Sequence, residues 1–150
     1  MAEDAVETST TDLPGDTRVI RVIRPGEIGP KSGGGTRPNS SEFSDSRQDG
    51  AMSVFLEPDI IAAGRRPDEL LHTNRFETGS RLSWVTLSFY RQQKQIVTRR
   101  PVDWFPGHAN VRDESGRRSG GKKTKLAGES KWLGEADDGE SAKSSQDLAN

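Results

Sequence analysis

Apolar residues are sparse along this chain and gather into short runs separated by polar, glycine-rich and proline-rich stretches. The clearest run is RLSWVTLSFY at residues 81–90, which is largely apolar on both alternating faces and predicts a central strand. Residues 18–24 and 51–56 are rich in β-branched and other apolar residues, and each predicts a strand. Residues 95–98 favour a short strand or the end of a helix, and residues 108–112 predict a last strand.

Helical signals are fewer and shorter. Residues 58–63 predict a helical turn that Gly64 ends. Residues 67–71 open on proline and acidic residues, an order typical of a first helical turn. Residues 122–133 predict a terminal helix with leucines on one stripe and lysines mostly elsewhere. Residues 29–50 are mostly polar and glycine-rich and predict a long loop. Together these elements predict an α+β (mixed α/β) fold of four or five short strands with a C-terminal helix.

Composition limits the size of that domain. The chain is 29% hydrophobic and 30% charged, with a mean hydropathy of -0.84, so we expect a small core or disordered ends. Residues 1–17 carry a net charge of -5 and residues 134–150 carry -4, whereas the whole chain carries -1. The remaining residues, 18–133, therefore carry +8. This distribution predicts one basic domain at residues 18–133 between two disordered acidic tails.

Several classes of function are disfavoured. The chain has no cysteine, which excludes disulfides, cysteine zinc sites and thiol nucleophiles. Its two histidines have no partner at metal-ligand spacing, so we expect no metal site and no cofactor. No apolar run approaches the roughly 20 residues that span a bilayer, and the acidic start does not resemble a signal peptide. These features favour a soluble cytoplasmic protein without a membrane partner.

Residues 33–41, GGGTRPNSS, are a candidate anion-binding loop. Glycines let backbone N–H groups approach an anion, and Arg37 could bind it through two parallel hydrogen bonds while Ser40 and Ser41 donate hydroxyls. The loop matches neither the P-loop nor the dinucleotide-binding pattern, and its composition is equally typical of a flexible surface loop.

A second candidate site combines residues distant in sequence. An early-strand arginine (Arg21 or Arg24), followed by the loop with Arg37, Ser40 and Ser41 and then by Glu57, is similar in order to ADP-ribosyltransferase-like folds. That resemblance implies an arginine on a pyrophosphate and a carboxylate at a cationic sugar. His108 follows a turn and is a candidate base. Arg24, Ser41 and His108 are therefore the catalytic candidates. Solvated surface charges and a structural histidine are the alternative interpretations.

The densest basic run, RRSGGKKTK at residues 117–125, is a candidate surface for nucleic acid or an acidic protein. No recognised nucleic-acid-binding module accompanies it, and a solvated loop and helix start would look the same. Its candidate contact residues are Arg117, Arg118, Lys122, Lys123 and Lys125.

Four features in order resemble a family of small uncharacterised bacterial proteins. They are an early arginine-containing strand, RPNSSEF at 37–43, MSV at 52–54, and PGHANV at 106–111 followed by KKTK at 122–125 and an apolar helix ending in Trp132. The resemblance spans residues 18–133 and implies a bacterial α/β or α+β unit with no assigned activity. Residues 113–120 look like extra loop and depart from the pattern.

Two functions follow as hypotheses. The first is a non-enzymatic accessory or interaction protein of a bacterial cytosol, whose basic face contacts nucleic acid or a partner. The alternative is a small enzyme that handles a nucleotide or NAD through residues 33–41. We expect an enzyme to gather Arg21 or Arg24, Arg37, Ser41 and His108 in one enclosed pocket, and an interaction protein to scatter them.

Overall fold

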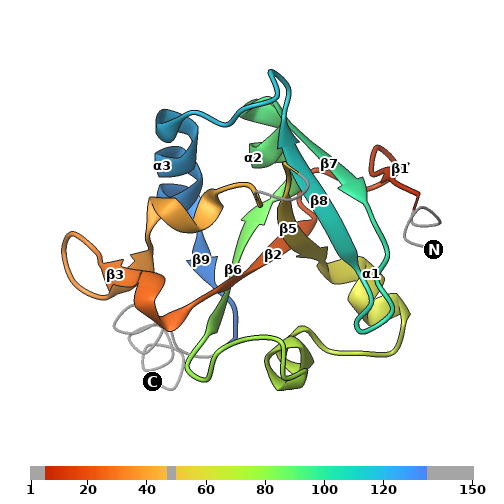
Figure 1. The fold of residues 1–150 in the computed structure, drawn as a ribbon, viewed down its shortest axis with the longest axis horizontal. Helices are drawn as coiled ribbons and strands as arrows, with labels where there is room; N and C mark the ends of the chain where they lie inside the picture. The colour runs from red at the N-terminus through yellow and green to blue at the C-terminus, as the bar shows by residue number, and fades with distance from the viewer. Residues whose placement is uncertain (1–5, 47–49, 135–150) are drawn as a thin grey trace, which may run out of the picture.

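The structure is a computed structural model, and it describes residues 6–46 and 50–134. Most of its strands form one antiparallel seven-stranded sheet in the order β1-β7-β8-β5-β2-β6-β9, beside a small β3-β4 hairpin (Figure 1). In chain order the strands are β1 (Thr8–Ser9), β2 (Arg18–Ile23), β3 (Ile28–Pro30), β4 (Thr36–Pro38), β5 (Met52–Leu56), β6 (Arg81–Thr86), β7 (Gln95–Arg99), β8 (His108–Asp113) and β9 (Lys131–Trp132).

Short helices cover both faces of the sheet. They are η2 (Pro25–Glu27), η3 (Ser40–Phe43), α1 (Glu57–Ala62), η4 (Pro67–His72), α2 (Leu87–Gln92) and α3 (Gly120–Glu129). The first core lies where α2, α3 and η3 pack on one face, and it includes Tyr90, Leu126 and Phe43. The second core lies on the opposite face beneath α1 and η4, around Ile60 and Leu70. The described part of the chain is thus a small α+β unit, as the sequence predicts in outline.

Strand β2 has apolar side chains on both of its faces, so both faces of the sheet must be covered. Val19 and Ile23 belong to the first core, whereas Ile20 and Val22 belong to the second, as alternation requires. The middle residue of the strand, Arg21, therefore points toward the first core. A guanidinium at such a position needs polar partners, because a buried charge without them is very costly.

The centre of the sheet opens between β2 and β5. Strand β2 pairs with β6 over six residue pairs, from Arg18 opposite Thr86 to Ile23 opposite Arg81. Strands β2 and β5 share only two pairs, which involve Val19 and Ile20 of β2. Beyond Ile20 the two strands separate, and the space between them is open to other groups. We call this opening the split.

The strand predicted at residues 81–90 is wrong in its second half. Strand β6 ends at Thr86, and α2 begins at the next residue. The Thr86 hydroxyl accepts a hydrogen bond from the Phe89 amide at 3.2 Å and caps the helix. As a result Leu87 is fully buried, while Phe89 and Trp84 are half-buried at the edges of the two cores.

The N-terminal segment also differs from its predicted disorder. Residues 8 and 9 form β1, which pairs with β7 at the edge of the sheet. Thr10 is buried and donates its hydroxyl to the Val97 carbonyl at 2.6 Å. Glu7 accepts hydrogen bonds from three side chains of β7 and β8. The predicted boundary at residue 18 is therefore too late. Residues 1–5, and all of the predicted C-terminal tail after Gly134, lie outside the described residues.

The remaining differences concern the second half of the chain and the predicted loop. Helix α3 starts at a cap made by Ser119, whose hydroxyl accepts from the Lys122 amide, and ends at Glu129. Strand β9 follows it, so β8 is not the last strand. The predicted loop at residues 29–50 contains β3, β4 and η3. No helix in the described ranges is long and apolar enough to cross a membrane.

Candidate functional site

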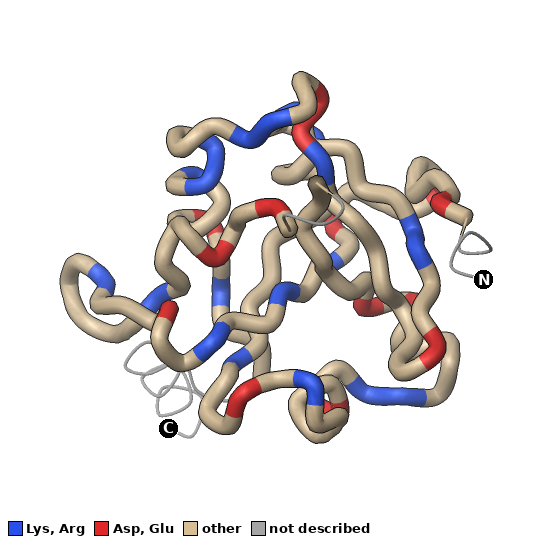
Figure 2. Tube along the Cα trace, viewed as in Figure 1, with Lys and Arg blue, Asp and Glu red and all other residues tan. Residues whose placement is uncertain are grey.

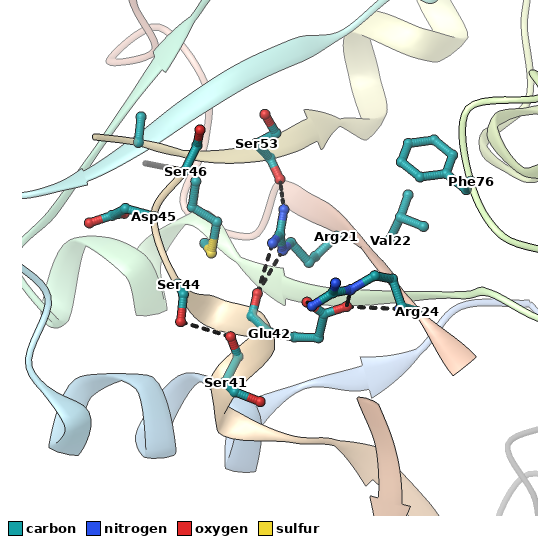
Figure 3. Close-up of a pocket in the computed structure, with 12 residues that line it drawn as sticks. Arg21, Val22, Arg24, Ser41, Glu42, Ser44, Asp45, Ser46, Ser53 and Phe76 are labelled. Carbon is teal, nitrogen blue, oxygen red and sulfur yellow. Dashed lines mark hydrogen bonds and ion pairs between the residues drawn. The ribbon is translucent and has the colours of Figure 1, made fainter. Parts of the chain in front are cut away.

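A pocket of about 330 Å³ lies at the split, where β2 and β5 part (Figure 3). Strand β2, η3, residues 44–46, the start of β5 and one aromatic side chain from residues 73–80 contribute to its wall. The lining residues are Arg21, Val22, Arg24, Ser41, Glu42, Ser44, Asp45, Ser46, Ala51, Met52, Ser53 and Phe76.

Arg21 crosses the split. Its Nε and Nη2 donate to the Glu42 carbonyl at 3.0 and 2.8 Å, and its Nη1 donates to the Ser53 carbonyl at 2.6 Å (Figure 3). The guanidinium thus joins β2, η3 and β5 where the strands share no ladder. Burial lowers the pKa of Arg21, and the nearby Glu42 carboxylate opposes that effect. A guanidinium has five N–H groups, and these three bonds leave two of them for a ligand.

Arg24 binds the side chain of Glu42, which is the only acidic residue of η3. Glu42 is 3% exposed, and its carboxylate accepts from the Arg24 amide at 2.8 Å and from Nε and Nη2 at 3.1 Å each. The hydrogen bond from Arg24 to this carboxylate raises the pKa of the arginine. The Glu42 carboxylate binds Arg24, and Arg21 donates instead to the neutral carbonyls of Glu42 and Ser53. The charge of Arg21 is therefore not matched by an ion pair within the described residues.

Serines supply the polar wall. Ser44 donates its hydroxyl to the Ser41 carbonyl at 2.7 Å, so its oxygen can still accept (Figure 3). Ser41 donates its own hydroxyl to the Glu27 carboxylate, which fixes the start of η3. The Ser53 hydroxyl lies 3.1 Å from Nε2 of His108. Hydroxyls that are held in this way can orient a ligand without adding charge.

His108 stands behind the pocket rather than in its wall. It is 8% exposed, and its Nδ1 lies 2.6 Å from the Arg100 carbonyl. A carbonyl only accepts, so Nδ1 carries a proton, and in the neutral ring Nε2 accepts from the Ser53 hydroxyl. The ring also meets Phe55 edge to face, with centroids 5.3 Å apart. In this arrangement the histidine positions Ser53.

The predicted site residues are only partly brought together. Arg24 and Ser41 line the pocket, and His108 touches it through Ser53. Arg37 is exposed on β4, and neither it nor Ser40 lines the pocket. The three glycines at 33–35 have positive φ and turn the chain between β3 and β4. The predicted anion-binding loop is therefore a hairpin turn whose end leads into η3.

Glu57, the carboxylate of the ADP-ribosyltransferase-like order, lies elsewhere. It begins α1, and its nearest cation is Arg18 at 4.0 Å. The sequence pattern indicates Arg21 only as an alternative to Arg24, and it does not indicate Glu42, Ser53 or Phe76. Arg21 had a usable signal, namely an arginine at the centre of an otherwise apolar strand.

The basic run at residues 117–125 does not act as one surface. Arg118 is 3% exposed, which corrects its predicted role as a contact residue. Its guanidinium donates to four acceptors at 2.6 to 3.2 Å: the Gln95 and Asp45 side chains and the carbonyls of Phe43 and Val111. These four hydrogen bonds offset the cost of burying the charge of Arg118.

Lys122 is also engaged. Its Nζ lies 2.8 Å from the Asp113 carboxylate, which is 4% exposed. Burial acts to raise the pKa of Asp113, but hydrogen bonds from Lys122, Ser115 and Gln95 outweigh it and hold the pKa well below its ordinary value. Arg117 and Lys125 are exposed and Lys123 is half-buried. Figure 2 shows Lys and Arg spread along the described part of the trace, interspersed with acidic residues.

Comparisons with known protein families, with curated proteins and with solved structures give no match to this chain. The resemblance to small bacterial proteins therefore stays a prediction from the sequence. In the described residues, no group of three or more histidine, aspartate or glutamate side chains could hold a metal ion.

Proposed function

We propose that this protein binds a small phosphate-bearing molecule in the pocket at the split. The observation that carries the proposal is Arg21, a half-buried residue whose guanidinium donates to two backbone carbonyls and has two further N–H groups for a ligand. An anion there would offset the cost of burying that charge. Because the anchoring carbonyls are neutral, the ligand would not displace an existing ion pair.

The second arginine favours a doubly charged ligand. The side chain of Arg24 is 58% exposed at the pocket edge, although one side of it binds Glu42. Guanidinium groups bind phosphate oxygens through paired hydrogen bonds, and two of them match a phosphate or pyrophosphate better than a carboxylate. Arg21 and Arg24 line one pocket, whereas Arg118 of the basic run is buried, so the two arginines favour phosphate binding in this pocket over the basic-face hypothesis, although Arg37 and His108 do not line it.

The proposal is confined to binding. A reaction of the ADP-ribosyl type needs a carboxylate near a cationic sugar, and the Glu42 carboxylate is occupied by three donors from Arg24.

Calorimetric titration with inorganic pyrophosphate, in a phosphate-free buffer at low salt, tests this proposal. Arg21→Lys keeps the charge but loses the planar fork, so we expect it to weaken binding about tenfold or more. Arg37→Ala is the matched control, because it removes an exposed arginine outside the pocket. Circular dichroism of each variant confirms that it folds. An absence of binding at millimolar pyrophosphate, or an equal loss in Arg37→Ala, would contradict the proposal.

A further inference from the structure

We infer that the ligand of this pocket is a nucleoside monophosphate whose base stacks on Phe76. The inference rests on the proposed function, since it assigns the phosphate to Arg21 and Arg24. It adds a second recognition element, Phe76, which is the one aromatic side chain among the described residues of the pocket wall. Figure 3 shows the Phe76 ring beside Val22, at a different part of the pocket from the Glu42 and Arg24 pair.

Phe76 is held in place from behind. Its ring lies 6.1 Å from the ring of Trp104 at an interplanar angle of 60°, and Trp104 in turn meets Phe55 edge to face at 5.7 Å. The guanidinium of Arg75 lies 4.5 Å from the Trp104 ring centroid. This cluster fixes the orientation of Phe76, which stays half-buried. An aromatic ring that is positioned by its neighbours and still partly exposed in a polar pocket is suited to stacking on a flat ligand.

The size of the pocket selects the ligand class. Small-molecule pockets range from about 300 to 1,000 Å³, and this pocket is at the lower end of that range. One base, one sugar and one phosphate suit such a volume better than a dinucleotide does. Ser44 and Ser53 also line the pocket, and hydroxyls of this kind suit a sugar.

The test compares nucleotides with ligands that lack either the base or the phosphate. Equilibrium titrations are made with AMP, GMP, CMP, UMP, ribose 5-phosphate and adenosine, and Trp104 beside Phe76 provides an intrinsic fluorescence signal. We expect at least one nucleotide to bind about tenfold or more tightly than ribose 5-phosphate, as stacking of a base on an aromatic side chain implies. Adenosine, which lacks the phosphate, should bind more weakly than AMP.

Variants at the aromatic position separate this inference from the proposal it rests on. Phe76→Ala should reduce nucleotide affinity to the level of ribose 5-phosphate and leave ribose 5-phosphate unchanged, whereas Phe76→Trp should retain the preference for nucleotides. Ile96→Ala is the control, because it truncates an exposed apolar side chain of β7 that does not line the pocket.

Two results would overturn the inference in different ways. If ribose 5-phosphate binds as tightly as every nucleotide, and Phe76→Ala changes neither, the stacking inference is wrong while phosphate binding stands. If no phosphate-bearing ligand binds, both fail.

Discussion

Glu7 fastens the N-terminal segment to the sheet, and its removal should destabilise the protein in a pH-dependent way. Its carboxylate accepts from Arg112 at 2.6 Å, Thr98 at 2.7 Å and Asn110 at 2.9 Å. The hydrogen bond from Arg112 is the largest cause that lowers the pKa of Glu7 from 4.5 to about 2, against an opposing effect of burial.

The size of the effect follows from that pKa. A pKa difference of about 2.5 corresponds to about 3.4 kcal/mol of stability at neutral pH. The side chains of Glu7 and Arg112 are 27% and 37% exposed, so solvent screening reduces this value. We expect Glu7→Gln to lower the free energy of unfolding by about 1–2 kcal/mol at pH 7. Because the folded pKa is depressed, this stability is present above about pH 4.5 and is lost as the pH falls toward 2.

Urea denaturation followed by circular dichroism measures this difference at pH 7, 5, 4 and 3. The gap between wild type and Glu7→Gln should be largest at pH 7 and should narrow below pH 5. Asp16→Asn is the control, since Asp16 is an exposed acid of the same segment. The reasoning is refuted if the gap is absent at pH 7, or if it has the same size at every pH.

Three further predictions concern stability, measured by urea or thermal denaturation. Arg118→Ala should lower the free energy of unfolding by about 3–5 kcal/mol, because it leaves buried polar groups without a hydrogen-bond donor. Substitution of its exposed neighbour, Arg117→Ala, should change that free energy by no more than about 0.5 kcal/mol. Equal effects would show that Arg118 is not buried. Gly107→Ala should cost more than Gly116→Ala, since both have positive φ but only at Gly107 would a Cβ lie 2.9 Å from a backbone oxygen. Leu87→Ala should cost about 2–5 kcal/mol, and a loss below about 1 kcal/mol would contradict its place in the first core.

The strands could be predicted well where apolar runs are bounded by turn residues. The runs at residues 18–24 and 51–56 correspond to β2 and β5 within about one residue at each end, the ordinary uncertainty of such boundaries. Helix α2 could not be predicted in this way, because six residues show fewer than two helical turns and continue the apolar run of β6. The threonine cap at residue 86 was the available signal, and alternation concealed it.

The N-terminal segment was missed for a different reason. Its acidic, aromatic-free composition is typical of disorder when it is considered alone. What orders it is complementary charge far along the chain, since Asp12 pairs with Arg99 at 2.9 Å and Glu7 with Arg112 at 2.6 Å. Such pairs depend on strand order, which local composition does not report.

The candidate site shows the same limit at the level of single residues. Arg117 and Arg118 are chemically identical neighbours in the sequence, yet one is exposed and the other is buried among four acceptors. Likewise Ser53 and Phe76 became pocket residues only when the loop before β6 was placed beside β5. Sequence reasoning could propose which chemistry was present, but tertiary contacts decided which groups meet.

The split has a consequence for how the protein is made. It divides the sheet into two halves, β1-β7-β8-β5 and β2-β6-β9, and the chain passes between them from β1 to β2, β2 to β5, β5 to β6, β6 to β7 and β8 to β9. Neither half is therefore a contiguous stretch of sequence. The half that carries Arg21 is complete only once Trp132 has left the ribosome, because β9 pairs with β6, and this non-local pairing is expected to be slow. For the same reason, no single cut in the backbone separates the two halves into different fragments.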